Sequence, residues 1–294
     1  MRPGGMLVST DVRWHRRAAA VALAFTIGIG GLSCTRPDPD PDPGTTTTTG
    51  STGTTGTTAP NGQAPPGPGS AAWVPVPRNR VAEECGLDPA LLEQADRRIG
   101  SGYSVVRYGK LCWSGGSSST TEAYQVFSVT KTWGALLVGM VSARSSLRDT
   151  DLASKWLSLT QRSGLNSDAT IAHILGMTAT SRNLAPGQKN RYSYDTVGTR
   201  ELNKLVDVMN AAISREPANF NGARDVYEFA NNVVIPKLGM TGASWPRGSA
   251  IAYGLQASVN DMARLGLLIL RKGNWNGEQL ISEEYVYRIT HPSF

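Results

Sequence analysis

A serine and a lysine three residues apart are the residues of this chain whose types and spacing could do chemistry together. Ser128 and Lys131 stand immediately before a strongly apolar run that begins at Ala135. On a helix, this spacing places both side chains on one face within hydrogen-bonding range, and the helix N-terminus favours a developing alkoxide. A neutral lysine amine could accept the serine's proton and so activate the hydroxyl as a nucleophile without histidine.

Histidine offers no comparable arrangement. The three histidines are His15, His173 and His291, so a Ser-His-Asp triad or a zinc site would have to be built around His173. A helical histidine among apolar neighbours is more often a core or capping residue than a catalyst. The chain also has no G-x-S-x-G, H-E-x-x-H or P-loop motif, so the usual hydrolase and nucleotide signatures are missing.

The composition describes a globular protein. Of the 294 residues, 40% are hydrophobic and 18% are charged, which excludes a wholly disordered chain and a polytopic membrane protein. The formal net charge is +6, but lysine and arginine are scattered and form no run that could follow a phosphate backbone,. We therefore expect no binding to nucleic acid.

The N-terminal residues 1–34 have the layout of a signal peptide. Basic residues at 13–17 precede an apolar run over 18–32, which is shorter than the roughly 20 residues of a normal membrane span. The run ends in Gly31-Leu32-Ser33-Cys34, which is similar to a bacterial lipoprotein box except that Gly31 stands where an aliphatic residue is usual. We expect cleavage before Cys34 and lipidation of its thiol, which would anchor the exported chain to the bacterial cell membrane. An ordinary signal peptide and secretion are the alternative.

Residues 35–70 repeat Pro-Asp and then run through Thr/Gly and Pro/Gly stretches. This composition cannot bury a core, so we predict a disordered linker that separates the membrane from a globular domain over residues 71–294. Cys85 and Cys112 fall in that domain. In an oxidising compartment they could form a disulfide or remain as buried thiols. We predict the disulfide, because Cys112 lies on a predicted strand and Cys85 just before a helix that would pack on it.

The apolar patterns predict an α+β domain. A helix opens at Asp88-Pro89, and a hairpin over 104–114 turns at Gly109-Lys110. In the helix expected at about 258–271, Ser258 is the predicted N-cap and Asp261 its reciprocal partner. Because the early strands are few, they would need further strands to complete a sheet. The later helices are expected at about 128–143, 168–176, 199–214, 224–235 and 258–271.

Residues 121–131 with the apolar helix that follows resemble the nucleophile segment of the serine β-lactamase and penicillin-binding-protein-like family. The resemblance is closest to the branch of class C enzymes, carboxylesterases and amide-oligomer hydrolases. Further segments fall in the order of that family's motifs, namely 149–157, 170–178, 235–241 and 253–270. The resemblance implies a β-lactamase/transpeptidase-like fold, with an antiparallel sheet flanked by helices and a helical subdomain.

The family's second motif, Y-x-N or Y-x-S, has two candidates here. Counting back from the next helix favours Tyr194, with Thr196 in the serine place, whereas counting forward from residues 186–187 favours Tyr192. Tyr194 is our prediction and Tyr192 the alternative. Asp168 lacks the asparagine of an S-D-N triplet after it, so we interpret Asp168 as the N-cap of its helix.

The family's third motif, K-T-G or H-x-G, is absent, although the family places it after the helix at 258–271. The resemblance therefore also implies that the C-terminal sheet strands are missing, and we expect a fragment rather than an inactive product.

By resemblance, Ser128 would attack an amide or ester carbonyl, Lys131 and Tyr194 would transfer protons, and the Ser128 N–H would form half of an oxyanion hole. The substrate would be a small molecule or peptide: a β-lactam, a D-amino-acid peptide, a short amide or an ester. No metal or organic cofactor is implied, and no oligomeric state. The alternative is a non-catalytic envelope lipoprotein that keeps the fold as a binding or sensing module.

Overall fold

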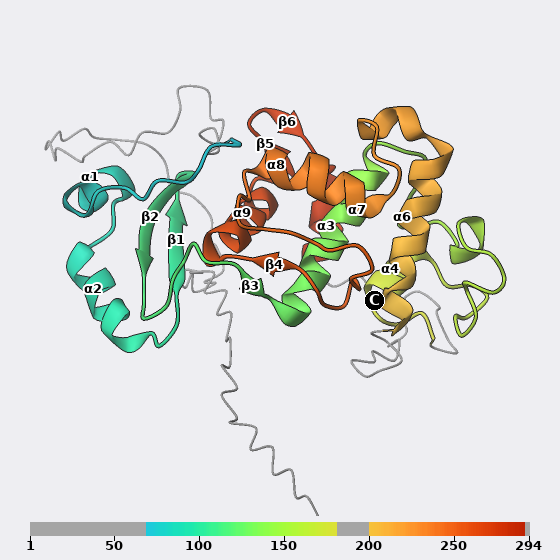
Figure 1. Ribbon diagram of the computed structural model, residues 1–294, viewed down its shortest axis with the longest axis horizontal. Helices are drawn as coiled ribbons and strands as arrows, with labels where there is room; N and C mark the ends of the chain where they lie inside the picture. The colour runs from blue at the N-terminus through green and yellow to red at the C-terminus, as the bar shows by residue number, and fades with distance from the viewer. Residues whose placement is uncertain (1–68, 181–199, 292–294) are drawn as a thin grey trace, which may run out of the picture. The chain divides into compact units, whose positions relative to one another are not determined.

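The computed structural model describes residues 69–180 and 200–291 (Figure 1). The predicted signal peptide, Cys34 and nearly all of the predicted linker lie outside these ranges. Tyr192 and Tyr194 also lie outside the described residues.

The N-terminal hairpin is antiparallel. Strands β1 (Tyr103–Arg107) and β2 (Lys110–Gly115) pair with Val105 opposite Trp113, and the register shifts between Val105 and Val106. The turn is Tyr108-Gly109, with φ angles of 54° and 75°. A two-residue hairpin turn of this kind needs positive φ at both positions. The predicted turn at Gly109-Lys110 was therefore wrong by one residue, because Lys110 already pairs with Arg107.

Helices lie against both faces of this hairpin (Figure 1). Helices α1 (Val81–Cys85) and α2 (Pro89–Arg98) pack on β2, and α9 (Val259–Leu270) packs on β1. Cys85 and Cys112 form a disulfide, which confirms that prediction. The bridge joins α1 covalently to β2 and indicates an oxidising, extracytoplasmic environment.

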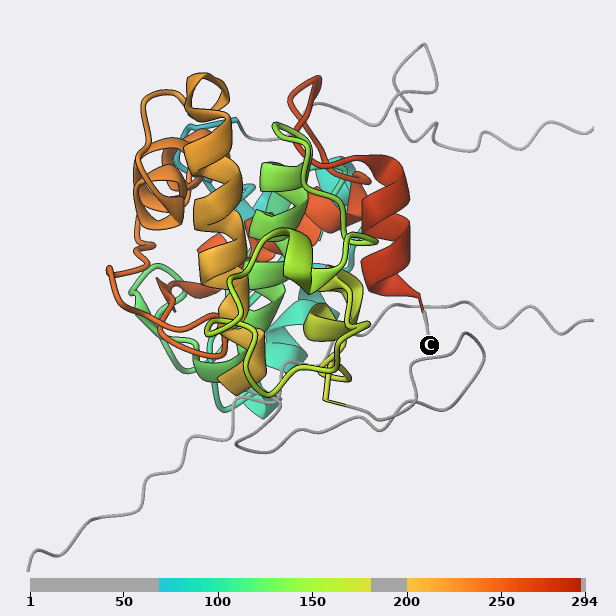
Figure 2. The same ribbon diagram turned by 90° about the vertical axis from the view of Figure 1, so that its right-hand side faces the viewer.

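The most buried helix of the described chain is α3 (Thr130–Ser142), which follows a short 3₁₀ turn at Phe127–Val129. Apolar residues occupy nearly all of its faces, as expected for a helix inside a core,. Figure 2 shows α3 between α6 (Lys204–Arg215) and α10 (Glu283–Thr290), and both contact it. At Gly139 an added Cβ would lie 2.7 Å from the ring of Tyr285, so glycine permits the close approach of α10.

The remaining elements are short. The sheets in the described residues are three antiparallel pairs, β1–β2, β3–β4 and β5–β6, so the chain has the predicted α+β character, with small open sheets. No helix within 69–180 and 200–291 is long and apolar enough to cross a bilayer. The short elements mentioned above are α4 (Ile171–Leu175), α7 (Val226–Glu228), α8 (Ile235–Leu238), β3 (Tyr124–Gln125), β4 (Gln256–Ala257), β5 (Asn274–Trp275) and β6 (Glu278–Gln279).

Two predicted helix starts had different outcomes. The capping box of Ser258 and Asp261 at α9 is confirmed. The prediction for Asp168 was wrong, because α4 begins after Thr170, whose hydroxyl accepts from the His173 N–H. The His173 ring completes this box by accepting from the Thr170 N–H at 3.1 Å,. His173 is thus a capping residue, as expected.

The helix expected over 224–235 is not a single α-helix. It comprises α7, a π-helical stretch at Phe229–Val234, and α8. Pro236 in α8 has no N–H to continue the α-helical bonding pattern through this junction. The helix expected over 199–214 corresponds to α6 and to the helical residues 200–202 just before it.

Asp96 of α2 connects this helix to the hairpin. Its Oδ1 accepts from Tyr103 OH at 2.8 Å, from Trp113 Nε1 at 3.1 Å and from Gly116 N at 3.1 Å. Burial acts to raise the pKa of Asp96, but the hydrogen bonds from Trp113, Tyr103 and Gly116 outweigh it and hold the pKa below its usual value of 3.8,.

Replacing Asp96 tests this connection. The folded state favours the ionised form of Asp96. The carboxylate therefore stabilises the fold above pH 3.8, and this stabilisation is lost as the pH falls below that value,. We expect Asp96→Asn to lower the free energy of unfolding by about 1–3 kcal/mol at pH 7, and by less at pH 3, in urea titrations. Asp88→Asn on the same helix is the matched control, because asparagine also caps helices,. An equal deficit for Asp96→Asn at both pH values would contradict the assignment.

Candidate active site

The structure brings Ser128 and Lys131 together at the start of α3. Lys131 Nζ lies 2.9 Å from Ser128 Oγ and donates to the carbonyl oxygen of Ala252, also at 2.9 Å. Ser128 is exposed and Lys131 is half-buried. An accessible hydroxyl in hydrogen-bonding contact with an amine is the arrangement that nucleophilic catalysis without histidine needs.

A cavity of about 440 Å³ opens beside this pair. Two aromatic residues, Phe127 and Tyr253, line it with 65% and 57% of their surfaces exposed. Arg200 and Asn203, which lie just before α6, line another part of it. A small ligand could therefore reach the serine hydroxyl between aromatic and polar side chains.

The turn that presents Ser128 is held from inside by Thr130. Phe127 has a φ of 47°, a left-handed conformation that is uncommon outside glycine,. The Thr130 hydroxyl donates to the Phe127 carbonyl at 2.6 Å and accepts from the Leu255 N–H at 3.2 Å. Thr130 is fully buried. One side chain therefore fixes the serine turn and also joins it to residues 251–255.

The backbone of Ala252 is held on both sides. Its carbonyl accepts from Lys131, and its N–H donates to Asn203 Oδ1 at 3.1 Å. The segment also lies close against α3, because a Cβ added at Gly134 would be only 2.4 Å from Ile251 Cγ2. These contacts fix the position of the carbonyl that orients the lysine.

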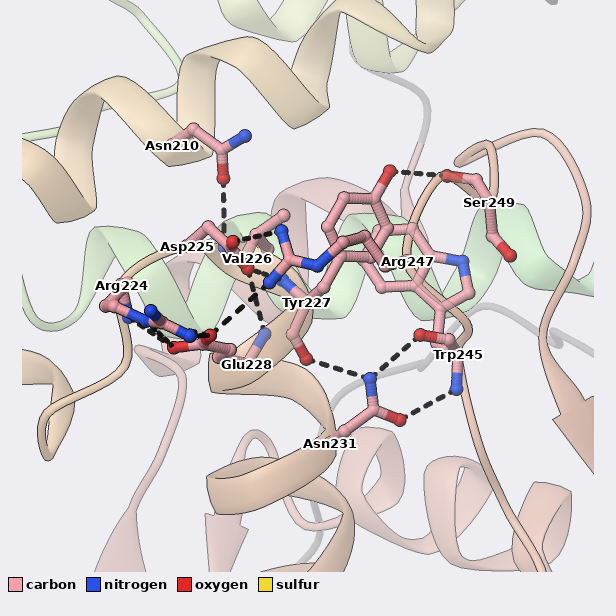
Figure 3. A network of polar contacts seen from close by, with 10 residues as sticks. All are labelled: Asn210, Arg224, Asp225, Val226, Tyr227, Glu228, Asn231, Trp245, Arg247 and Ser249. Carbon is pink, nitrogen blue, oxygen red and sulfur yellow. Dashed lines mark hydrogen bonds and ion pairs between the residues drawn. The ribbon is translucent and has the colours of Figure 1, made fainter.

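A polar network fastens the chain that leads to Ala252 (Figure 3). Asn231 donates to the carbonyls of Tyr227 and Trp245 at 2.8 Å each and accepts from the Trp245 N–H at 2.9 Å. Tyr227 OH donates to the Ser249 carbonyl at 2.8 Å. The residues before the site are thus tied to the helical segment that begins at α7.

Ion pairs complete this network. Arg247 pairs with Asp225 and Glu228, and Arg224 also pairs with Glu228 (Figure 3). Hydrogen bonds from Arg224 lower the pKa of Glu228 to about 2, so this carboxylate stays ionised at neutral pH. The pairs therefore persist over the ordinary pH range.

Sequence reasoning found the Ser128–Lys131 pair but assigned no role to Thr130, Asn203 or Ala252. A backbone carbonyl carries no sequence signal, and Asn203 has no characteristic spacing from the serine. Tyr194 and Tyr192 lie outside the described residues, so the choice between them stays a prediction. Among residues 69–180 and 200–291, no three His, Cys, Asp or Glu side chains gather closely enough to hold a metal ion.

Removing the Thr130 hydroxyl tests its place in the site. Thr130→Val keeps the side-chain shape but leaves the Leu255 N–H and the Phe127 carbonyl without this partner. We expect the free energy of unfolding to fall by about 1–3 kcal/mol, measured by urea denaturation. Thr130→Ser keeps the hydroxyl and should lose less. Equal stability of the valine and serine variants would show that the hydroxyl does not hold the turn.

Comparison with known proteins finds similarity in structure alone. No protein-family model matches the chain, and no curated protein matches it. A candidate β-lactamase from Bacteroides dorei DSM 17855 matches with a TM-score of 0.50 and 16% identity, over 67% of this chain and 66% of that one. An octameric penicillin-binding protein homologue from Pyrococcus abyssi matches with a TM-score of 0.49 and 15% identity, over 70% of this chain and 59% of that one.

The match to the Bacteroides protein thus spans slightly less than two thirds of its length. At this identity the likeness establishes the fold, and it agrees with the α+β arrangement and with the fold expected from the sequence. The chain has the fold of the β-lactamase and penicillin-binding-protein-like serine hydrolases.

Proposed function

We propose that the chain is a serine hydrolase that cleaves amide or ester bonds through an acyl-enzyme on Ser128. The observation that carries the proposal is the contact of Lys131 Nζ with Ser128 Oγ at 2.9 Å beside an open cavity. The fold supports it, because this fold includes serine hydrolases. Substrates of the proposed reaction are small molecules or peptides.

In the proposed reaction, Ser128 Oγ attacks the substrate carbonyl carbon while its proton passes to the neutral amine of Lys131. The carbonyl re-forms as the bond to the leaving amine or alcohol breaks, and the leaving group takes up a proton. Water then attacks the acyl carbon, releases the acid and returns the proton to Ser128. Tyr194, with Tyr192 as the alternative, is proposed to relay these protons.

The geometry around Lys131 supports a role in proton transfer. The hydrogen bond to the Ala252 carbonyl fixes the position of Nζ. The amine is therefore already placed beside the serine hydroxyl before the reaction begins,. The serine turn lies at the N-terminal end of α3, where the helix dipole stabilises developing negative charge,. The Ser128 N–H is proposed as one donor of an oxyanion hole.

A covalent probe tests the nucleophile. Ser128 Oγ should attack the phosphorus of a fluorophosphonate and expel fluoride to solvent, which leaves a phosphonyl adduct on the peptide that contains this residue, detected by mass spectrometry. A fluorescent penicillin should acylate the same residue. Ser128→Ala should abolish labelling. Lys131→Ala should slow it by about 100-fold or more, the usual contribution of a proton-transfer group.

Ser118→Ala, at another exposed serine, is the matched control and should label at the original rate. Folding of each variant is checked by its urea midpoint. If folded protein takes up neither probe at Ser128, the hydrolase proposal fails and the non-catalytic binding module becomes the better interpretation.

We also propose that the mature chain is lipid-anchored through Cys34. The disulfide supports export, since such bonds form in oxidising compartments,. Mass spectrometry of the mature N-terminus should find Cys34 as the first residue with attached acyl chains, and Cys34→Ser should release the protein from the membrane fraction. An unmodified N-terminus at another residue would instead indicate an ordinary signal peptide.

A further inference from the structure

Resting on the proposed hydrolase, we propose that Arg200 forms a subsite for a carboxylate of the substrate. The substrates would then be short amides or esters that carry a negative charge near the scissile carbonyl. Three features of the site support this subsite: the position of Arg200, the partial neutralisation of its charge, and the other residues that line the cavity.

Arg200 faces the same space as the Ser128–Lys131 pair. The Asn203 N–H donates to the Arg200 carbonyl at 3.1 Å, so the two residues are one tight helical turn apart and their side chains lie on one face,. The Asn203 side chain reaches Ala252, the residue that binds Lys131. Arg200 therefore lies on the helix face that is turned toward the cavity. It lines this cavity, and its side chain is 71% exposed.

The charge of Arg200 is only partly balanced within the protein. Its Nε lies 3.4 Å from Glu201 Oε1, and the buried Glu201 carboxylate also pairs with Lys204 Nζ at 3.3 Å. One carboxylate is thus shared by two cations. Among the described residues, Glu201 is the single ion-pair partner of Arg200, and the pair uses Nε. The two terminal nitrogens of the guanidinium can therefore serve a ligand.

The rest of the cavity also favours an anion. None of its described lining residues is acidic, and the Arg200 guanidinium carries a permanent positive charge,. A guanidinium matches a carboxylate through two parallel hydrogen bonds, which a point charge cannot do. Phe127 and Tyr253 provide apolar walls for the uncharged part of the substrate. Together these groups select a short acyl or leaving group that ends in a carboxylate.

Matched ester pairs test the subsite. Mono-4-nitrophenyl succinate and 4-nitrophenyl butyrate have acyl groups of the same length and differ in charge. Likewise, 4-carboxyphenyl butyrate and 4-(methoxycarbonyl)phenyl butyrate differ in charge on the leaving group. We measure kcat/KM for each ester and express each pair as the ratio of the anionic to the neutral substrate.

The expected result is that Arg200→Gln lowers at least one of these ratios by about tenfold, as for the loss of a charged hydrogen bond in a partly exposed site. Arg200→Lys should recover part of the loss, because it restores the charge without the planar fork. Arg97→Gln is the matched control, since it removes an exposed charge from α2. Ratios that Arg200→Gln leaves unchanged in both pairs would overturn the proposal and leave Arg200 as a partner of Glu201 alone.

A binding measurement separates this proposal from the proposed function. The probes are N-methylsuccinamate and its neutral counterpart N-methylbutyramide, with affinities measured by NMR titration of the Ser128→Ala variant with and without Arg200→Gln. Weaker binding of the anionic probe alone in the double variant supports the subsite even if no ester is hydrolysed. Equal binding of that probe by both proteins overturns the subsite even if Ser128 labels with a fluorophosphonate.

Discussion

The candidate site depends on the position of one amino group. Lys131 Nζ bridges the Ser128 hydroxyl, one helical turn away, and the Ala252 carbonyl, 121 positions away in the sequence. The first contact is local and would form in any helix with this spacing. The second requires the segment before β4 to lie against the start of α3. The local pair thus becomes a defined site through a tertiary contact.

The surrounding contacts hold residues 251–255 in this position against α3. Thr130 joins the serine turn to Leu255, and Asn203 holds the Ala252 N–H. Farther out, the network around Asn231 and Tyr227 fastens the residues that lead to Ala252 (Figure 3). In each of these links a side chain from another part of the chain binds a backbone atom of this segment.

Local chemistry was predictable from the sequence where a motif contains its own partners. The Ser258–Asp261 box, the helix start at Asp88-Pro89 and the hydrogen-bonding contact of Ser128 with Lys131 each need only residues within four positions, and the structure contains all three. The Cys85–Cys112 disulfide could be predicted because few pairings were possible.

Prediction failed where the decisive partner could not be read from the pattern. Asp168 and Thr170 are both acceptable caps, and the His173 ring decided in favour of Thr170 by completing its box. Strands β3 and β4 have two residues each, too few for an alternating pattern to appear,. The contacts of Ala252 and Asn203 involve backbone atoms and segments far apart in sequence. Such contacts follow from the packing of α3, not from any local run of residues.

The backbone at Phe127 has a consequence for the evolution of the site. A left-handed φ costs a non-glycine residue about 1–3 kcal/mol, and the phenyl ring is mostly exposed and recovers little of that cost through packing. Glycine would suit this backbone better but would remove an aromatic wall beside the serine. Selection for thermal stability and selection for the aromatic wall of the cavity would therefore favour different residues at position 127.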